Sequence, residues 1–222
     1  MNRPPMMRSL LLAALAALFA AGCTGTKAAS DTGTTAGKTN VKSNEPVPIS
    51  NRAKLLFEDA LGAMEAQKKA NAFDYPSLER KFKAALDADP NVAEAEYNLG
   101  VLAERQGNTQ EAVSRYQTAL KKKPTLRQAS ENLAVMAQNA GDVSGAVSLY
   151  QGILKVYPDD GNARARLAEI YRQTGDQEKA MELARAALMR EPQSVTAYKV
   201  MMRSYLERKQ LAMAKLVALR AM

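Results

Sequence analysis

The chain has 222 residues, of which 46% are apolar and 24% charged, and its net charge is +8. It contains no His, no Trp and a single Cys. Because His is the commonest general base and metal ligand, and because one Cys can form neither an internal disulfide nor a cysteine zinc site, this composition argues against an enzyme and against a metal site. The sequence has no basic run interleaved with aromatic residues, which argues against a nucleic-acid partner. We therefore expect no cofactor, no metal and no small-molecule substrate.

The first residues have the pattern of an export signal. Arg3 and Arg8 supply a basic start. Residues 10–21 then form an apolar run, which is shorter than the roughly 20 residues that span a bilayer. The run ends in small residues just before Cys23. We therefore predict that residues 1–22 are a signal peptide and that the protein leaves the cytoplasm.

The residues Ala20, Ala21, Gly22 and Cys23 resemble the lipobox of bacterial lipoproteins, although Ala20 stands where Leu is usual. The resemblance implies that Cys23 is acylated, becomes the first residue of the mature protein and anchors it to a membrane. Thr24 follows Cys23. In many such lipoproteins the absence of Asp at this position favours the outer membrane, so we expect an anchor there, with the protein facing the periplasm. The alternative is an ordinary signal peptide followed by an unpaired cysteine.

Residues 23–50 contain the predicted anchor and a linker rich in Thr, Gly, Ser, Lys and Asn. Such a composition cannot bury enough apolar surface to offset the entropy cost of ordering the chain. We predict a flexible tether that spans roughly 30 Å, from about 5–6 Å times the square root of the residue number. It would let the folded part reach away from the membrane.

Beyond residue 92 the sequence repeats in steps of 34 residues. When the repeats are aligned, equivalent positions form columns. The apolar columns have helical spacing, and the small residues in some of them let two helices approach to about 8–10 Å. A proline at the end of each repeat stops the second helix. The main columns are Leu99, Leu133 and Leu167; Ala112, Ala146, Ala180 and Ala214; Tyr116 and Tyr150; and Pro124, Pro158 and Pro192.

Between the two helices of each unit the pattern predicts a tight turn. A glycine is expected in the left-handed conformation at the end of the first helix, and an Asn or Asp follows as the N-cap of the second. Lys209 breaks the glycine column in the last unit. The predicted pairs are Gly107 and Asn108, Gly141 and Asp142, and Gly175 and Asp176.

The stretch AEAEYNLGVLAERQGNTQEAVSRYQTALKKKP, residues 93–124, resembles the tetratricopeptide repeat, and the match extends over about residues 93–222. The usual Trp of the family is replaced at its position by Glu96, Ser130, Arg164 and Tyr198. The resemblance implies an all-α solenoid of antiparallel helix pairs. Its units are a divergent pair at residues 51–92, full repeats at 93–126, 127–160 and 161–194, and an incomplete repeat at 195–222. Since this last unit lacks a polar cap, we expect either that the natural chain continues or that this end self-associates.

In this family the first helix of each pair lines a concave groove that binds peptides or helices of partner proteins. A clamp for C-terminal carboxylates that occurs in one subfamily is matched only at Asn132 and Arg166 and is therefore rejected. Mapped by repeat position, the expected groove residues are Tyr97, Asn98, Val101, Arg105, Gln128, Asn132, Val135, Asn139, Asn162, Arg166, Glu169, Arg172, Lys199 and Arg203, with Glu94, Glu104, Glu131 and Gln173 beside them.

These patterns together predict a non-enzymatic, lipid-anchored scaffold that binds envelope proteins of a motility or secretion complex. The array resembles tetratricopeptide lipoproteins of bacterial gliding motility. This resemblance rests on the sequence of residues 206–222, LERKQLAMAKLVALRAM. It also resembles the pilot lipoproteins of type IV pilus secretins. A regulator of a cell-wall enzyme is the third alternative.

Overall fold

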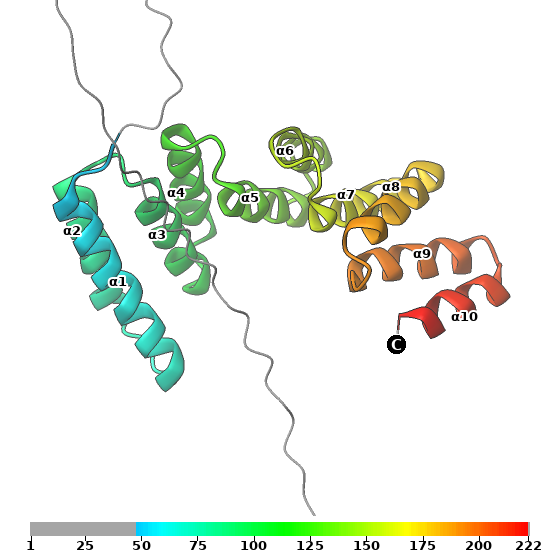
Figure 1. The fold of residues 1–222 in the computed structure, drawn as a ribbon, viewed down its shortest axis with the longest axis horizontal. Helices are drawn as coiled ribbons and strands as arrows, with labels where there is room; N and C mark the ends of the chain where they lie inside the picture. Colours follow the sequence, from blue (N-terminus) through cyan, green and yellow to red (C-terminus); the bar gives the residue numbers. More distant parts are fainter. Residues whose placement is uncertain (1–47, 222) are drawn as a thin grey trace, which may run out of the picture. The chain divides into compact units, whose positions relative to one another are not determined.

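The computed structural model describes residues 48–221. Within these residues the chain folds into helices without any strand, as the sequence predicts (Figure 1). The predicted signal peptide, Cys23 and most of the predicted tether lie outside the described residues. The helices are α1 (Asn51–Ala70), α2 (Tyr75–Ala88), α3 (Ala93–Arg105), α4 (Thr109–Lys122), α5 (Arg127–Asn139), α6 (Val143–Val156), α7 (Gly161–Gln173), α8 (Gln177–Arg190), α9 (Val195–Glu207) and α10 (Leu211–Arg220).

The helices pack as consecutive pairs. Each odd-numbered helix has its most extensive contact with the even-numbered helix that follows it. Each even-numbered helix from α2 to α8 also packs against the first helix of the next pair. Because short turns join the paired helices, the two run antiparallel, and the apolar faces of successive pairs form a series of adjoining cores.

The turns inside the pairs follow the predicted glycine column. The backbone angle φ is 79° at Gly107, 81° at Gly141 and 91° at Gly175. This left-handed region costs glycine nothing, because glycine has no Cβ. Lys209 takes the same place in the last pair with a φ of 58°. The geometry of the turn is therefore kept even where the sequence column is broken.

The second helices begin and end much as predicted. The carboxylates of Asp142 and Asp176 each accept a hydrogen bond from the backbone N–H three residues on, at 2.9 and 3.1 Å, which confirms both as N-caps. Asn108 occupies the predicted N-cap position of α4, but its side chain makes no capping hydrogen bond. Glu111 in the first turn of α4 complements the helix dipole. Each of α4, α6 and α8 ends two residues before the proline of its repeat.

Small residues and buried tyrosines fill the space between paired helices. Ala112, Ala146 and Ala180 are fully buried in successive second helices. Tyr116 and Tyr150, one turn later in their helices, are the largest fully buried side chains. The alanines let the helices come close, and the tyrosine rings fill the volume that remains.

The packing between α3 and α4 leaves no room for a side chain at Gly100. A Cβ placed on Gly100 would come within 2.6 Å of Cε1 and 2.7 Å of Cδ1 of Tyr116. No real Cβ contact is this short, so glycine at this position is a packing requirement. The ring of Tyr97 covers the same tyrosine, with its centroid 5.6 Å from that of Tyr116.

A buried ion cluster occupies the position where the repeat family has Trp. Glu96 is only 7% exposed, and its carboxylate lies 2.9 Å from Nη1 of Arg115 and 2.7 Å from Nζ of Lys122. Burial raises the pKa of Glu96, but the hydrogen bonds and charges of the two cations outweigh it and hold the pKa below its usual value. This cluster joins α3 to α4 by charge, at the position where the family pattern has an aromatic ring.

The divergent first pair has its own means of closure. The rings of Phe57 in α1 and Phe82 in α2 lie 5.9 Å apart at their centroids. Asn71 ends α1 in the left-handed conformation, and Asp74 caps α2 by accepting a hydrogen bond from the N–H of Ser77 at 3.0 Å. Residues 71–74 between α1 and α2 are thus an ordered connection.

We predict opposite effects for two glycine substitutions. Gly100→Ala should destabilise the fold by about 1–3 kcal/mol, because the added methyl group overlaps the ring of Tyr116. Gly62→Ala should stabilise it by roughly 0.5–1 kcal/mol, because Gly62 lies within α1 and nothing lies within 4 Å of the added Cβ. Urea unfolding of both variants measures the difference. Equal effects would show that the contact with Tyr116 does not limit packing.

Candidate functional site

The predicted groove residues lie on α3, α5, α7 and α9, the first helices of the four repeats. We call the surface that these residues form the first-helix face. Polar side chains connect neighbouring first helices across it. Gln138 on α5 donates a hydrogen bond to Gln173 on α7 at 3.0 Å. Asn162 on α7 donates to Glu131 on α5 at 3.0 Å.

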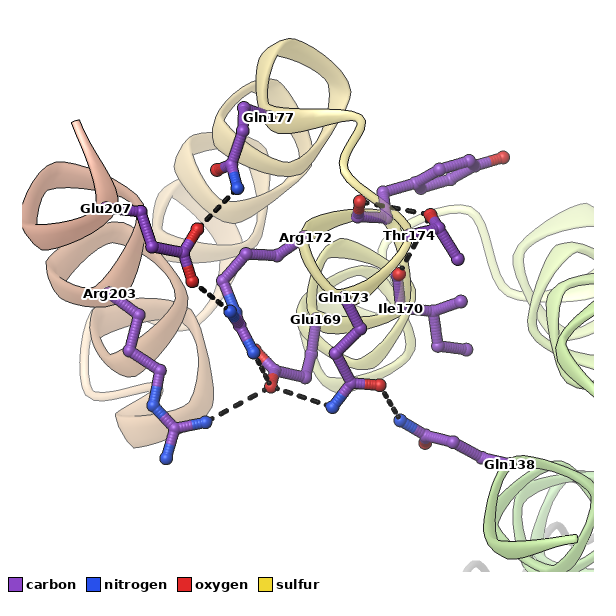
Figure 2. Close-up of polar contacts among 10 residues, drawn as sticks. Gln138, Glu169, Ile170, Arg172, Gln173, Thr174, Gln177, Arg203 and Glu207 are labelled. Carbon is purple, nitrogen blue, oxygen red and sulfur yellow. Dashed lines mark hydrogen bonds and ion pairs between the residues drawn. The ribbon is translucent and has the colours of Figure 1, made fainter. Parts of the chain in front are cut away.

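A cluster of charges joins α7 to α9 on this face (Figure 2). Glu169 is its centre: its carboxylate accepts hydrogen bonds from Arg172 at 2.8 and 3.0 Å, from Gln173 at 3.1 Å and from Arg203 at 3.2 Å. Arg172 also reaches Glu207 on α9 at 2.5 Å. Three predicted groove residues are therefore brought together, and they are held by one another.

The second carboxylate of the cluster extends it to a third helix. Glu207 accepts a hydrogen bond at 2.5 Å from the amide of Gln177, at the start of α8. One carboxylate therefore joins α7, α8 and α9, as Figure 2 shows. Because several charges share these contacts and the Arg172 side chain is largely buried, the cluster fixes the angle between the last two repeats more firmly than a lone surface pair would.

The ionisation of Glu169 follows from this environment. Burial raises the pKa of Glu169, but the hydrogen bonds and charge of Arg172, with the charge of Arg203, outweigh it and hold the pKa below its usual value. The same contacts raise the pKa of Arg172. Glu169 and Arg172 are therefore both charged at neutral pH.

Asn132, expected in the groove, instead takes part in a polar network at the edge of the core. The Tyr116 hydroxyl donates to Glu104 at 2.7 Å and accepts from the Asn132 amide at 2.8 Å. Burial, together with the hydrogen bond to Glu104, raises the pKa of Tyr116 well above its usual value, so the hydroxyl stays protonated. Asn132 thus satisfies a buried group and links α5 to α4.

Two further predicted residues are also engaged within the protein. Asn98 is buried, and its amide donates to the Glu94 carbonyl at 2.7 Å. The guanidinium of Arg105 lies 4.8 Å from the centre of the Phe73 ring, in the turn between α1 and α2. These contacts hold α3 and the first pair in place.

The remaining predicted residues, together with the exposed Arg203 of the charged cluster, form the accessible part of the first-helix face. Arg166, Lys199 and Arg203 are exposed and place three positive charges on α7 and α9. Exposed amides and half-buried apolar side chains lie on α3 and α5; these are Gln128, Asn139, Val101, Val135 and Tyr97. Such a surface can bind a peptide backbone through its amides and acidic side chains through its cations.

Sequence reasoning did not assign Gln138 or Glu207 to this face. Both could have been found from the repeat itself. Several contacts between neighbouring first helices join residues that are 34 or 35 positions apart, as in Glu169 with Arg203 and Arg172 with Glu207. Glu207 stands one repeat after Gln173, so its position follows from the register.

The described residues give two further results. They contain no group of His, Cys, Asp and Glu that could hold a metal ion. None of the helices in residues 48–221 is both long enough and apolar enough to cross a bilayer.

The charged cluster predicts a pH-dependent stability. Because the folded-state pKa of Glu169 is lowered from about 4.5, its ionised form stabilises the fold above that pH, and this contribution is lost as the pH falls through the folded-state value. Glu169→Gln should cost about 1–3 kcal/mol at pH 7, since it leaves Arg172 without its charged partner. The difference from the unsubstituted protein should shrink toward pH 3.

Thermal unfolding at several pH values measures this effect. Glu65→Gln is the matched control, because Glu65 is exposed and lies 3.7 Å from the equally exposed Lys69. A Glu169→Gln penalty that does not change with pH would mean that the charge of Glu169 does not stabilise the fold.

Comparisons with known proteins agree with this architecture. Family profiles described as Tetratricopeptide repeat match residues 79–127 and 137–205, together more than half of the chain. A search of curated protein sequences finds no match.

Several solved structures are similar to this chain. MamA from Desulfovibrio magneticus RS-1 is 17% identical with a TM-score of 0.65, over 78% of this chain and 95% of its own. Pseudomonas aeruginosa PilF is 14% identical with a TM-score of 0.65, over 77% and 75%. PilW, a widely conserved type IV pilus biogenesis factor, is 18% identical with a TM-score of 0.64, over 78% and 77%. With its repeat columns, its paired helices and these matches, the chain belongs to the tetratricopeptide-repeat family of protein-interaction scaffolds.

Proposed function

We propose that the protein is a lipid-anchored scaffold that binds an acidic segment of an envelope protein on its first-helix face. The observation that carries this proposal is the accessible row of Arg166, Lys199 and Arg203 beside exposed amides. Exposed cations beside amides suit an extended acidic peptide, since the amides pair with its backbone and the cations with its carboxylates. The Glu169 cluster supports this role, because it holds α7 and α9 rigidly and so orders the surface before a partner binds.

The proposed anchor rests on the sequence before the folded unit. The basic start, the short apolar run and the small residues before Cys23 favour export and acylation. Thr24 at the following position favours the outer membrane. The polar linker up to about residue 50 would then carry the helical array away from the membrane into the periplasm.

Two kinds of envelope machine fit such a scaffold. The likeness to PilF and PilW supports a role in type IV pilus assembly, as a pilot lipoprotein would have. A role in gliding motility is supported only by the amino-acid sequence of residues 206–222 and stays a sequence prediction. Regulation of a cell-wall enzyme is the remaining alternative; it would require that the purified protein change the rate of a hydrolase.

The anchor predicts where the protein is found after cell fractionation. The unsubstituted protein should sediment with the outer membrane and enter the detergent phase, because several acyl chains on Cys23 make release very slow. Cys23→Ala should move it to the soluble or inner-membrane fraction, since the thiol that would be acylated is gone. An unchanged distribution would contradict acylation at Cys23 and favour an unprocessed or plain signal peptide.

The first-helix face predicts which substitutions remove the partner. Arg166→Glu combined with Lys199→Glu should lower capture of the partner from solubilised envelope by about tenfold or more, because like charges then face the acidic segment. Lys155→Glu is the matched control: Lys155 is equally exposed but lies on α6, a second helix. Equal capture by all three proteins, identified by mass spectrometry, would show that the partner binds elsewhere.

A further inference from the structure

Exposed apolar side chains are concentrated on and near α8 and α10. Among the described residues, the large apolar side chains that are more than half exposed include Met189 at 82%, Leu211 at 68%, and Leu216 and Leu219 at 60% each. One more stands far away in sequence, Leu55 on α1, at 68%. A patch of this kind on a soluble unit marks a surface that another molecule covers.

The repeat register shows that the packing of the array does not demand these leucines. In the earlier repeats, the position of Leu216 and the position of Leu219 hold exposed polar or charged side chains, even though those repeats have a neighbouring pair on each side. At the position of Leu216 these are Ser114, Ser148 and Glu182, and at the position of Leu219 they are Gln117, Gln151 and Arg185. Both leucines therefore replace polar residues on an outward-facing surface.

Beside these leucines lies an apolar groove between α8 and α10, with α9 as its floor. Its volume is about 510 Å³, and its walls include Met189, Tyr198, Met213 and Leu216. The charged residues that line it are Arg185 and Arg220, and no acidic residue does. The groove thus offers apolar contact flanked by positive charge.

Charge decides what can occupy this groove. The segment of α9 and α10 has a single acid, Glu207, against six basic residues, which are Lys199, Arg203, Arg208, Lys209, Lys215 and Arg220. Two copies of this surface would repel each other if they met face to face, so a symmetric contact is disfavoured. The occupant should be a helix that carries carboxylates beside an apolar strip.

The chain itself carries a helix face of this kind. On α1, Leu55, Glu58, Gly62, Glu65 and Ala66 are exposed, and their spacing places them on one side of the helix. Lys69 follows on the same side, where it lies 3.7 Å from Glu65 in a pair that solvent fully screens. Nothing lies within 4 Å of the Cβ position of Gly62, so large side chains of another molecule can approach the backbone there. Glu58 and Glu65 can then meet Arg185 and Arg220.

We propose that α1 of one copy docks in the groove between α8 and α10 of the next, in a head-to-tail contact between copies of this chain. The leucines of α10 pack over the small residues of α1, and the acids of α1 pair with the two groove arginines. Because the two surfaces differ, an assembly of any length keeps one surface of each kind free at its ends, and growth is open-ended. The first-helix face stays available to its partner.

The test is the association of the full chain carrying Cys23→Ala, so that acylation cannot cluster it, in one fixed detergent. Sedimentation velocity across a wide range of concentration should show growing oligomers beyond the dimer. Arg185→Glu with Arg220→Glu should weaken association about tenfold or more, and so should Glu58→Lys with Glu65→Lys. Mixing these two variants should restore assembly, because each then offers the charge that the other lacks.

Two further variants separate docking from folding. Leu216→Ser with Leu219→Gln copies the residues of an earlier repeat, so it should abolish association while the thermal unfolding temperature stays unchanged. Lys155→Glu is the control and should associate normally. A monomer at all concentrations, a closed symmetric dimer, or a failure of the mixed charge variants to assemble would each overturn the proposal.

Discussion

The array depends on how closely the two helices of each pair can approach. Alanines in the second helices, and Gly100 in α3, leave room for the buried rings of Tyr116 and Tyr150. A methyl group at Gly100 would already overlap Tyr116. Because every pair also serves as the surface on which the next pair packs, an error in one interhelical distance would be transmitted along the solenoid.

Polar side chains determine what these stacked pairs present to solvent. Glu96 replaces an aromatic ring with an ion cluster between α3 and α4, and Glu169 joins α7 to α9 by charge. Both carboxylates have lowered pKa values, because nearby cations outweigh the cost of burial. The side chains predicted to bind a partner thus fall into two groups. One group holds the helices together, and the other remains accessible to solvent.

This division explains the chemistry of the candidate sites. Asn132 and Arg172 satisfy groups of the protein itself, whereas Arg166 and Lys199 face solvent. The first-helix face and the groove between α8 and α10 are both bordered by positive charge, and α9 contributes different residues to each of them. An interaction scaffold of this family can use separate faces at once, because each repeat exposes both of its helices.

The sequence by itself determined the helix pairs, their turns and most of their caps, because small, apolar, glycine and proline columns act through local geometry that repeats every 34 residues. It also located the residues of the first-helix face. Only the tertiary structure decided which of them are engaged, since Asn98, Asn132 and Arg172 find partners on other turns or other helices. The same holds for the groove beside Leu216, which exists only where α8, α9 and α10 meet.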